Sequence, residues 1–208
     1  MATLEKKLLE ENDFETPYSI GFTVKGIKTF FFNRFDVNGF EASMDAPPGS
    51  KKNKFKNRDM ETLVWRADDG MLAVEGKDFQ KALSAAGRYF KDPSGTGRRS
   101  VKPMTEEALT AEEELCSFGV KTWDAIDVRP ARLRNGATVP VYRPILKAGW
   151  ELQVTIDVAL PDHLRPGDIA GLMNLAGRIH GVGDNRKYGF GRFVVTNVEA
   201  PQDLTWID

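Results

Sequence analysis

The chain has few of the residues that build a disulfide-stabilised, zinc-binding or membrane protein. Its 208 residues include one cysteine, Cys116, and two histidines. A single thiol excludes a disulfide framework within the chain and a thiolate zinc site. The longest apolar runs fall well short of the ~20 residues that span a bilayer. Residues 1–12 contain no apolar stretch typical of a secretory signal, so we expect a cytoplasmic protein.

The chain also lacks an excess of charge of either sign. Lysine and arginine number 29, aspartate and glutamate number 30, and the net charge is −1. This balance excludes a polycationic nucleic-acid binder of the histone-like kind, so any nucleic-acid role must come from local patches. The hydrophobic fraction of 41% is enough for a core. The length suits a single domain with insertions, which we expect to cover residues 1–208.

Apolar periodicity predicts a mixture of strands and helices. Alternating or β-branched segments predict strands at 18–32, 150–160 and 192–198. Apolar residues at helical spacing predict helices at 77–90 and 166–179, and the acidic segment 104–115 is interpreted as another helix. Asp-Gly and Asn-Gly pairs predict hairpin turns at 69–70 and 135–136. The second turn belongs to a ribbon, 123–146, that carries or adjoins Arg129, Arg132, Arg134, Arg143 and Lys147.

The order of these elements predicts an α+β fold. Two segments are interpreted as insertions, one of loop character at about 33–60 and one of helix and loop at about 91–118. With the first hairpin and the long insertion treated as additions, the order is β-α-β-β-α-β. That is the order of a ferredoxin-like antiparallel sheet. The same framework underlies the RNA-recognition fold, whose sheet face stacks bases, although fold alone does not decide function.

The most informative motif is a glycine-rich loop between the last helix and the last strand. Its pattern is Gly-apolar-Gly, five residues, Gly-apolar-Gly, formed by Gly181, Gly183, Gly189 and Gly191. Such glycines permit positive φ angles and a close approach of the backbone to another surface, and their N–H groups can form an anion-binding nest. The loop also supplies positive charge and an aromatic ring for stacking through Arg186, Lys187, Arg192 and Tyr188.

Two familiar phosphate-binding motifs do not fit this loop. A dinucleotide fingerprint needs the order strand, glycine turn, helix, whereas here the order is helix, turn, strand. A P-loop needs Gly-Lys-Ser/Thr at the start of a helix, which is absent. A tight helix-to-strand connection with no binding role stays open as the structural alternative.

The position and pattern of the loop resemble the signature loop of the RAMP superfamily, the RNA-binding proteins of CRISPR–Cas antiviral defence. The resemblance rests on about a dozen residues and on the order of elements. It implies that RNA contacts fall on Gly181, Gly183, Arg186, Lys187, Gly189 and Gly191, with Tyr188 and Arg192 as further candidates. In this family, backbone subunits coat a guide RNA, and other members process precursor RNA.

Other features favour a backbone subunit over a processing ribonuclease. Backbone subunits resemble a hand with a long loop inserted in a ferredoxin-like palm, which the 33–59 segment would suit. Further RNA contacts are expected in that insertion and in the loop after the first helix, at Lys51, Lys52, Lys54, Lys56, Arg58, Arg98 and Arg99. Each of these charged loops has a simpler interpretation as a solvated surface.

The candidates for catalysis are weak. Processing ribonucleases of the family usually use a histidine early in the chain, whereas His163 and His180 are both late. His180 adjoins the glycine loop and is the candidate acid or base, with a tyrosine as the alternative. His180 and Asp184 could share a metal, but two ligands make a poor site, so we expect no metal and no cofactor.

Three hypotheses about function follow. The favoured one is a non-catalytic protein that binds RNA or single-stranded nucleic acid and assembles side by side along the strand, or within a ribonucleoprotein complex. The second is an endoribonuclease of the same superfamily. The third is a phage or mobile-element protein that reuses the fold to bind protein partners. No feature points to a membrane.

Overall fold

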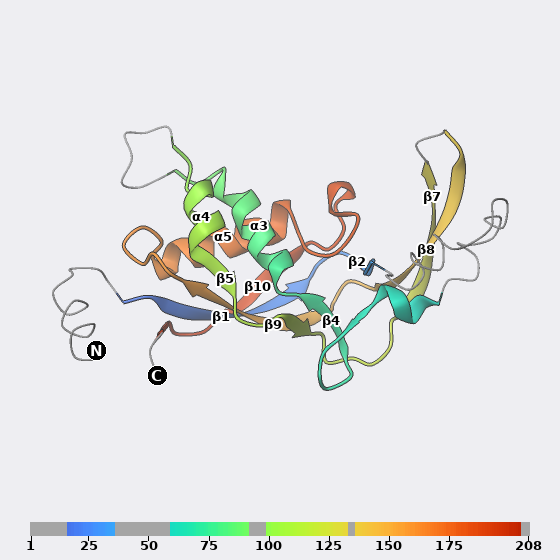
Figure 1. Ribbon diagram of the computed structural model, residues 1–208, viewed down its shortest axis with the longest axis horizontal. Coiled ribbons are helices and arrows are strands. Elements are labelled where there is room, and N and C mark those ends of the chain that lie inside the picture. The colour runs from blue at the N-terminus through green and yellow to red at the C-terminus, as the bar shows by residue number, and fades with distance from the viewer. Residues whose placement is uncertain (1–15, 36–58, 92–98, 133–135, 205–208) are drawn as a thin grey trace, which may run out of the picture.

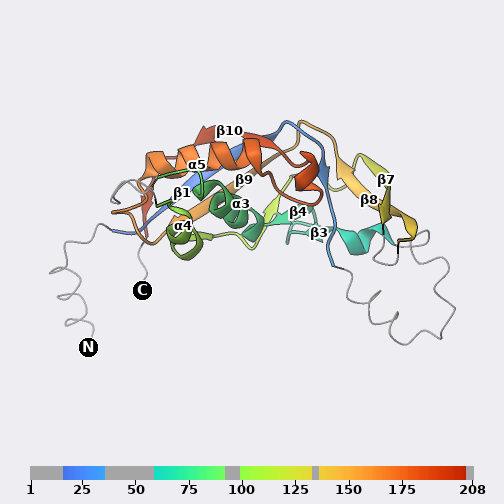
Figure 2. The same cartoon turned by 90° about the horizontal axis from the view of Figure 1, so that it is seen from above.

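The computed structural model describes residues 16–35, 59–91, 99–132 and 136–204. The largest sheet in these ranges is antiparallel, with the strand order β10-β1-β9-β5. Its strands are β1 (Tyr18–Gly26), β5 (Leu109–Ala111), β9 (Glu151–Val158) and β10 (Phe193–Val198), and β11 (Gln202–Asp203) pairs with the start of β1. The helices α3 (Lys77–Gly87), α4 (Lys102–Ala108) and α5 (Pro166–Ile179) cover one face of this sheet (Figures 1 and 2).

The core lies between the sheet and the helices because each element is apolar on one side. Alternate residues of β1, from Tyr18 to Val24, are buried, as are those of β9. Phe79 and Leu83 of α3 and the apolar face of α5 pack against them. The face of the sheet opposite the helices carries Thr23, Gln153, Thr155 and Asp157, and none of the described positions on it is aromatic. The described part of that face therefore lacks the stacking rings of an RNA-recognition sheet.

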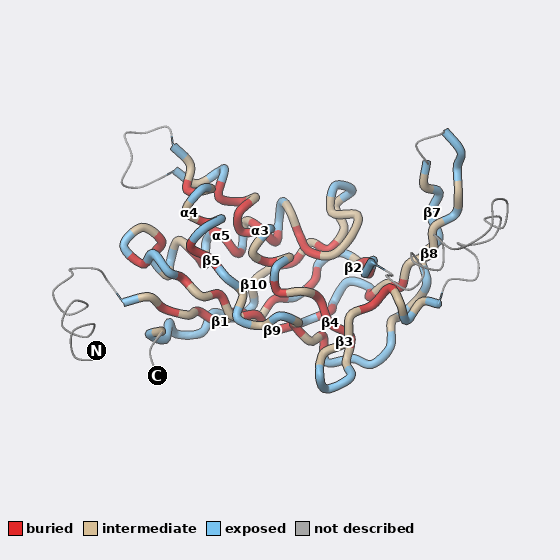
Figure 3. Tube along the Cα trace, in the orientation of Figure 1, coloured by how far each residue is buried: buried red, intermediate tan, exposed pale blue. Residues whose placement is uncertain are grey.

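Two smaller antiparallel sheets extend one end of the molecule. One has the order β2-β8-β7 and the other the order β3-β4-β6. Their strands are β2 (Phe30–Phe31), β3 (Trp65–Arg66), β4 (Leu72–Glu75), β6 (Leu115–Ser117), β7 (Ala125–Arg132) and β8 (Thr138–Leu146), and a 3-10 turn, η2 (Met60–Leu63), precedes β3. The β7–β8 ribbon projects from the body and is largely exposed toward its tip (Figure 3).

The predicted elements differ from the structure at two places. The strand predicted at 18–32 ends at Gly26, whose N–H donates to the carbonyl of Trp150 at 2.7 Å; beyond it, Phe30 pairs with Leu146 in another sheet. The helix predicted at 104–115 was wrong beyond Ala108, because Leu109 is buried and pairs with Val158 as an edge strand.

The other elements agree closely with the prediction. Helix α5 occupies 166–179, the hairpin predicted at 69–70 forms between β3 and β4, and β7 pairs with β8 on either side of the segment that holds the second predicted turn. The α+β class with antiparallel sheets is confirmed. Among the described residues, no helix has the length and apolar character needed to cross a membrane.

Candidate nucleic-acid interface

The glycine-rich loop packs its backbone tightly against neighbouring strands. All four glycines have positive φ angles, as does Asn185. The N–H of Gly191 donates to the carbonyl of Thr29 at 2.8 Å, and that of Val182 donates to the carbonyl of Gly191 at 3.0 Å. The N–H of Gly183 donates to the Asp78 carboxylate at 3.3 Å. Because protein acceptors occupy the N–H groups of all four glycines, these groups do not form an anion nest.

The lack of room for a side chain explains why three of the four positions are glycine. A Cβ on Gly191 would lie 1.8 Å from the carbonyl oxygen of Val182, and one on Gly181 would lie 2.5 Å from that of Gly191. A Cβ on Gly183 would lie 2.6 Å from the ring of Phe30. At Gly189 there is open space, so only its φ of 86° favours glycine. Gly181 and Gly191 thus let the loop close on itself, and Gly183 lets it pack against Phe30.

The loop presents a short 3-10 turn, η3 (Arg186–Tyr188), to solvent. The Tyr188 side chain is 67% exposed, and the ammonium of Lys187 lies 4.9 Å from its ring centroid. Arg192 is partly buried and donates to the carbonyl of Arg186 at 3.3 Å. Burial lowers the pKa of the Arg192 guanidinium. Arg192 therefore stabilises the turn through its contact with the Arg186 carbonyl, while Lys187 and Tyr188 face solvent.

The ribbon is fixed to the same loop by two arginines. Arg143 of β8 forms an ion pair with Asp184 at 2.7 Å. The Arg129 guanidinium of β7 lies 4.5 Å from the ring centroid of Phe190. It also pairs with Asp127, which raises its pKa. Arg129 and Arg143 thus hold the base of the ribbon against the glycine loop.

A groove of about 470 Å³, here called the basic groove, runs along α3 beside the glycine loop. It is lined by five cations, Lys77, Lys81, Arg88, Lys102 and Arg186, together with His180 and Glu106. Three of the cations have acidic partners, in the pairs Lys77–Glu75, Lys81–Asp78 and Lys102–Glu106. Five cations against three carboxylates leave the groove positive on a chain whose net charge is −1.

His180 caps the end of α5 and lines the basic groove. Its Nε2 lies 3.4 Å from a guanidinium nitrogen of Arg186. Burial lowers the pKa of the imidazole, and the positive charges of Arg186, Arg192 and Arg88 lower it further. His180 is therefore neutral at pH 7, a form that can accept a proton or a hydrogen bond.

A second cavity of about 410 Å³, here called the aromatic pocket, adjoins the basic groove. Its walls include Phe30–Phe35, Trp65, Asp78 and Asp184, and it shares Lys77, Lys81 and Arg186 with the groove. The Arg34 guanidinium stacks over the Trp65 ring, 4.1 Å from its centroid.

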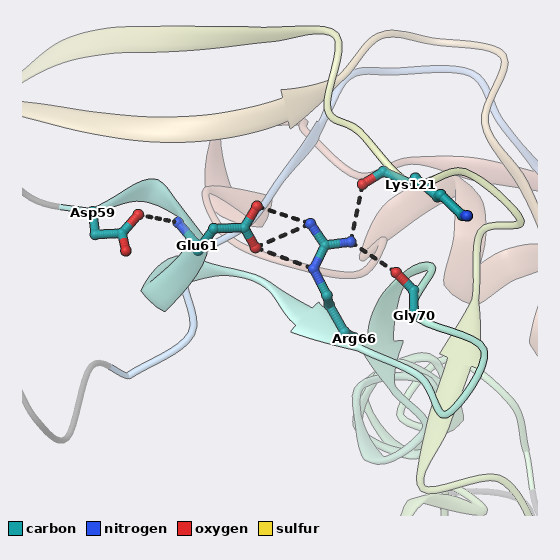
Figure 4. Close-up of polar contacts among 5 residues, drawn as sticks. All are labelled: Asp59, Glu61, Arg66, Gly70 and Lys121. Carbon is teal, nitrogen blue, oxygen red and sulfur yellow. Dashed lines mark hydrogen bonds and ion pairs between the residues drawn. The ribbon is translucent and has the colours of Figure 1, made fainter.

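Arg66, which follows Trp65 in β3, contacts three neighbouring segments (Figure 4). It makes a bidentate contact with the Glu61 carboxylate and donates to the carbonyls of Gly70 and Lys121 at 2.8 and 2.9 Å. Asp59 caps η2 by accepting from the Glu61 N–H at 3.0 Å. One guanidinium thereby joins η2, the β3–β4 turn and the segment before β7.

The predicted site residues divide into three groups. Gly181, Gly183, Arg186, Lys187, Tyr188, Gly189, Gly191 and Arg192 lie together in one loop. Arg99 is exposed near the isolated bridge between Lys91 and Ser100 and lines neither cavity. The cations predicted at Lys51, Lys52, Lys54, Lys56, Arg58 and Arg98, and Arg134 of the ribbon, lie outside the described residues. Contact of any of these residues with RNA stays a prediction.

Sequence reasoning missed the α3 side of the groove. Lys77, Lys81 and Arg88 recur at i, i+4 and i+11, the same spacing that revealed the apolar face of this helix. The polar periodicity was therefore a usable signal. Lys102 joins them through tertiary packing of α4 on α3, which no local pattern reveals.

The described residues include no cluster suited to a metal ion and no reactive thiol. Within the described ranges, no group of three or more His, Cys, Asp or Glu residues could hold a metal ion. Cys116 is buried in β6, and burial raises its thiol pKa to about 12. Such a thiol is unreactive at neutral pH.

Comparison with known proteins finds likeness in structure only. No protein-family model matches the chain, and no curated protein matches it. One similar structure is a chain in the cryo-EM structure of the type III-B Cmr-beta bound to cognate target RNA, with 10% identity and a TM-score of 0.53. That match covers 97% of this chain and 65% of the other, so this chain spans just under two thirds of its length. Another is the crystal structure of Cmr6 from Pyrococcus furiosus, with 11% identity and a TM-score of 0.49. That match covers 88% of this chain and 100% of the other. At 10% identity, this likeness shows that the chain shares its fold with that chain of the Cmr-beta structure.

Proposed function

We propose that this protein is a CRISPR-associated, RNA-binding subunit that holds single-stranded RNA along the basic groove without cutting it. The proposal is supported by the RAMP-like fold, shared with a chain of a complex described as bound to target RNA. At 10% identity that likeness concerns the fold, so the functional argument depends on the groove.

The observation that carries the proposal is the clustering of cations beside the glycine loop. Five cations line one open groove on a chain with no net positive charge. Lys187 and the exposed ring of Tyr188 directly follow Arg186, which lines the groove, in the loop. Phosphates need such a cationic track, and bases of a single strand need exposed rings for stacking.

The test is the salt dependence of RNA binding, measured by fluorescence anisotropy with a labelled, unstructured RNA. If the protein neutralises about 4–6 phosphates, log K falls against log salt with a slope of about −3 to −4. Single variants Arg88→Gln and Arg186→Gln each reduce the magnitude of that slope by about 0.7. Lys121→Gln is the matched control, because Lys121 is exposed and lines neither cavity. Absence of binding at low salt, or a slope near zero, would overturn the proposal.

Assembly along the strand is part of the same proposal. We expect purified protein to carry host RNA and to elute as a large species with a high ratio of absorbance at 260 to 280 nm. RNase treatment then reduces it to a small, nucleic-acid-free form. A clean species whose size RNase does not change would contradict assembly on RNA and would point to the alternative of a protein partner.

A second candidate function, endoribonuclease, is favoured by one observation. His180 lies in the basic groove as a neutral imidazole, which is the form of a general base. In that case the wild-type protein cleaves RNA, and His180→Ala abolishes cleavage while binding persists. RNA left intact by the wild-type protein, with and without divalent metal, would exclude this function.

A further inference from the structure

The aromatic pocket beside the basic groove has features that phosphate binding does not use. Its walls combine rings, a stacked guanidinium and carboxylates, and it opens next to cations that it shares with the groove. We infer that this pocket receives one unstacked nucleobase of the bound strand and favours a base with an exocyclic amine, such as cytosine, over uracil. The inference rests on the proposed RNA-binding function and adds base selection to it.

Stacking surfaces line the pocket. Bases that leave a strand's own stack are held on aromatic rings and on guanidinium planes. Arg34 and Trp65 already form such a stacked pair, and the Phe35 side chain beside them is 65% exposed. Arg66, the next residue of β3, is fixed by its contacts with Glu61, Gly70 and Lys121 (Figure 4), so the backbone that carries Trp65 is held in place.

The size and place of the pocket suit one base of a strand whose backbone follows the groove. Its volume of about 410 Å³ lies in the range of about 300–1,000 Å³ found for small-ligand sites. Lys77, Lys81 and Arg186 border both cavities. A phosphate held by these three cations therefore places its own nucleotide at the entrance of the aromatic pocket.

The carboxylates of the pocket give it a preference for one kind of base edge. Asp78 accepts long contacts from the Gly183 N–H at 3.3 Å and from Lys81 at 3.5 Å. Two carboxylate oxygens have about four lone-pair sites, so acceptor capacity remains. Cytosine presents its N4 amine as a donor to such an acceptor. Uracil presents the O4 carbonyl at the same position, which a carboxylate repels.

Two octamers of RNA, C8 and U8, form the matched pair for the test. Both are pyrimidine strands of equal charge, so phosphate binding is the same and only the base edge differs. We expect C8 to bind about five-fold more tightly, the ratio that one good contact to a base edge supplies. Asp78→Asn brings the ratio close to one. Because this substitution also removes a negative charge, both affinities can rise, and the ratio is the readout.

Tryptophan fluorescence tests the stacking directly. We expect C8 to quench the emission of the wild-type protein in a saturable way, and Trp65→Phe to remove that quenching although the other three tryptophans remain. Trp65→Leu weakens C8 binding, whereas the control Tyr89→Leu does not, because Tyr89 is 64% exposed and lines neither cavity. Thermal melting of each variant establishes that it is folded.

The outcomes separate this inference from the function on which it rests. Equal affinity for C8 and U8, or quenching that Trp65→Phe retains, overturns the inference. If both octamers still bind with a steep salt slope, the proposed function survives that result. If neither octamer binds at low salt, both the inference and the proposed function are overturned.

Discussion

Alanine substitutions at Gly189 and Gly191 separate two reasons why the loop contains glycine. Both residues have positive φ angles, 86° and 65°. A Cβ at Gly189 would meet nothing within 4 Å, whereas one at Gly191 would lie 1.8 Å from the backbone oxygen of Val182. Gly189→Ala therefore incurs only the cost of a left-handed backbone, while Gly191→Ala forces the loop to move.

The expected losses of unfolding free energy differ clearly. A non-glycine residue in the left-handed region costs about 1–2 kcal/mol, so Gly189→Ala loses about that amount. Gly191 also takes part in two backbone hydrogen bonds, to Val182 at 3.0 Å and to Thr29 at 2.8 Å. Each contributes about 1 kcal/mol net. Gly191→Ala therefore loses about 3–4 kcal/mol in total.

Urea denaturation followed by tryptophan fluorescence measures both values. The reasoning also predicts that folded Gly189→Ala binds RNA like the wild type, because the glycine N–H groups serve the protein and not a ligand. Equal losses at the two positions would refute the argument that close packing against the Val182 backbone, and not the left-handed backbone alone, requires glycine at position 191.

Three further measurements test other parts of the structure. Cys116, with a thiol pKa of about 12, resists an aromatic disulfide reagent at pH 8 in the folded protein and reacts fully in urea; rapid reaction of the folded protein would contradict its burial. Because the pKa of His180 is lowered on folding, the unfolded chain binds more protons near pH 6. Stability therefore falls as the pH is lowered through about 6.5, and His180→Gln flattens that dependence in urea titrations at several pH values. A double-mutant cycle of Arg143→Gln and Asp184→Asn gives a coupling of about 1 kcal/mol; no coupling would show that the ion pair does not hold the ribbon to the loop.

The sequence by itself determined the elements whose signals are local. Helix α5 begins at Pro166 and ends at Ile179 as its apolar spacing predicts. The Asp-Gly turn produces its hairpin, and β7 and β8 pair on either side of the second predicted turn. The paired glycines marked a loop with left-handed backbone, and its place between the last helix and the last strand indicated the fold. These features depend on residues a few positions apart, so they are visible without tertiary contacts.

Only the tertiary structure decided β5, the basic groove and the aromatic pocket. Residues 109–111 form a strand because β9 offers them an edge, although their neighbours favour a helix. The groove is lined by Lys81, Lys102 and Arg186, which come from different elements, and the pocket is lined in the same way by Arg34, Trp65 and Asp78. Such sites depend on which faces of distant elements come together. That outcome is set by burial of the shared core, to which these charged residues contribute little.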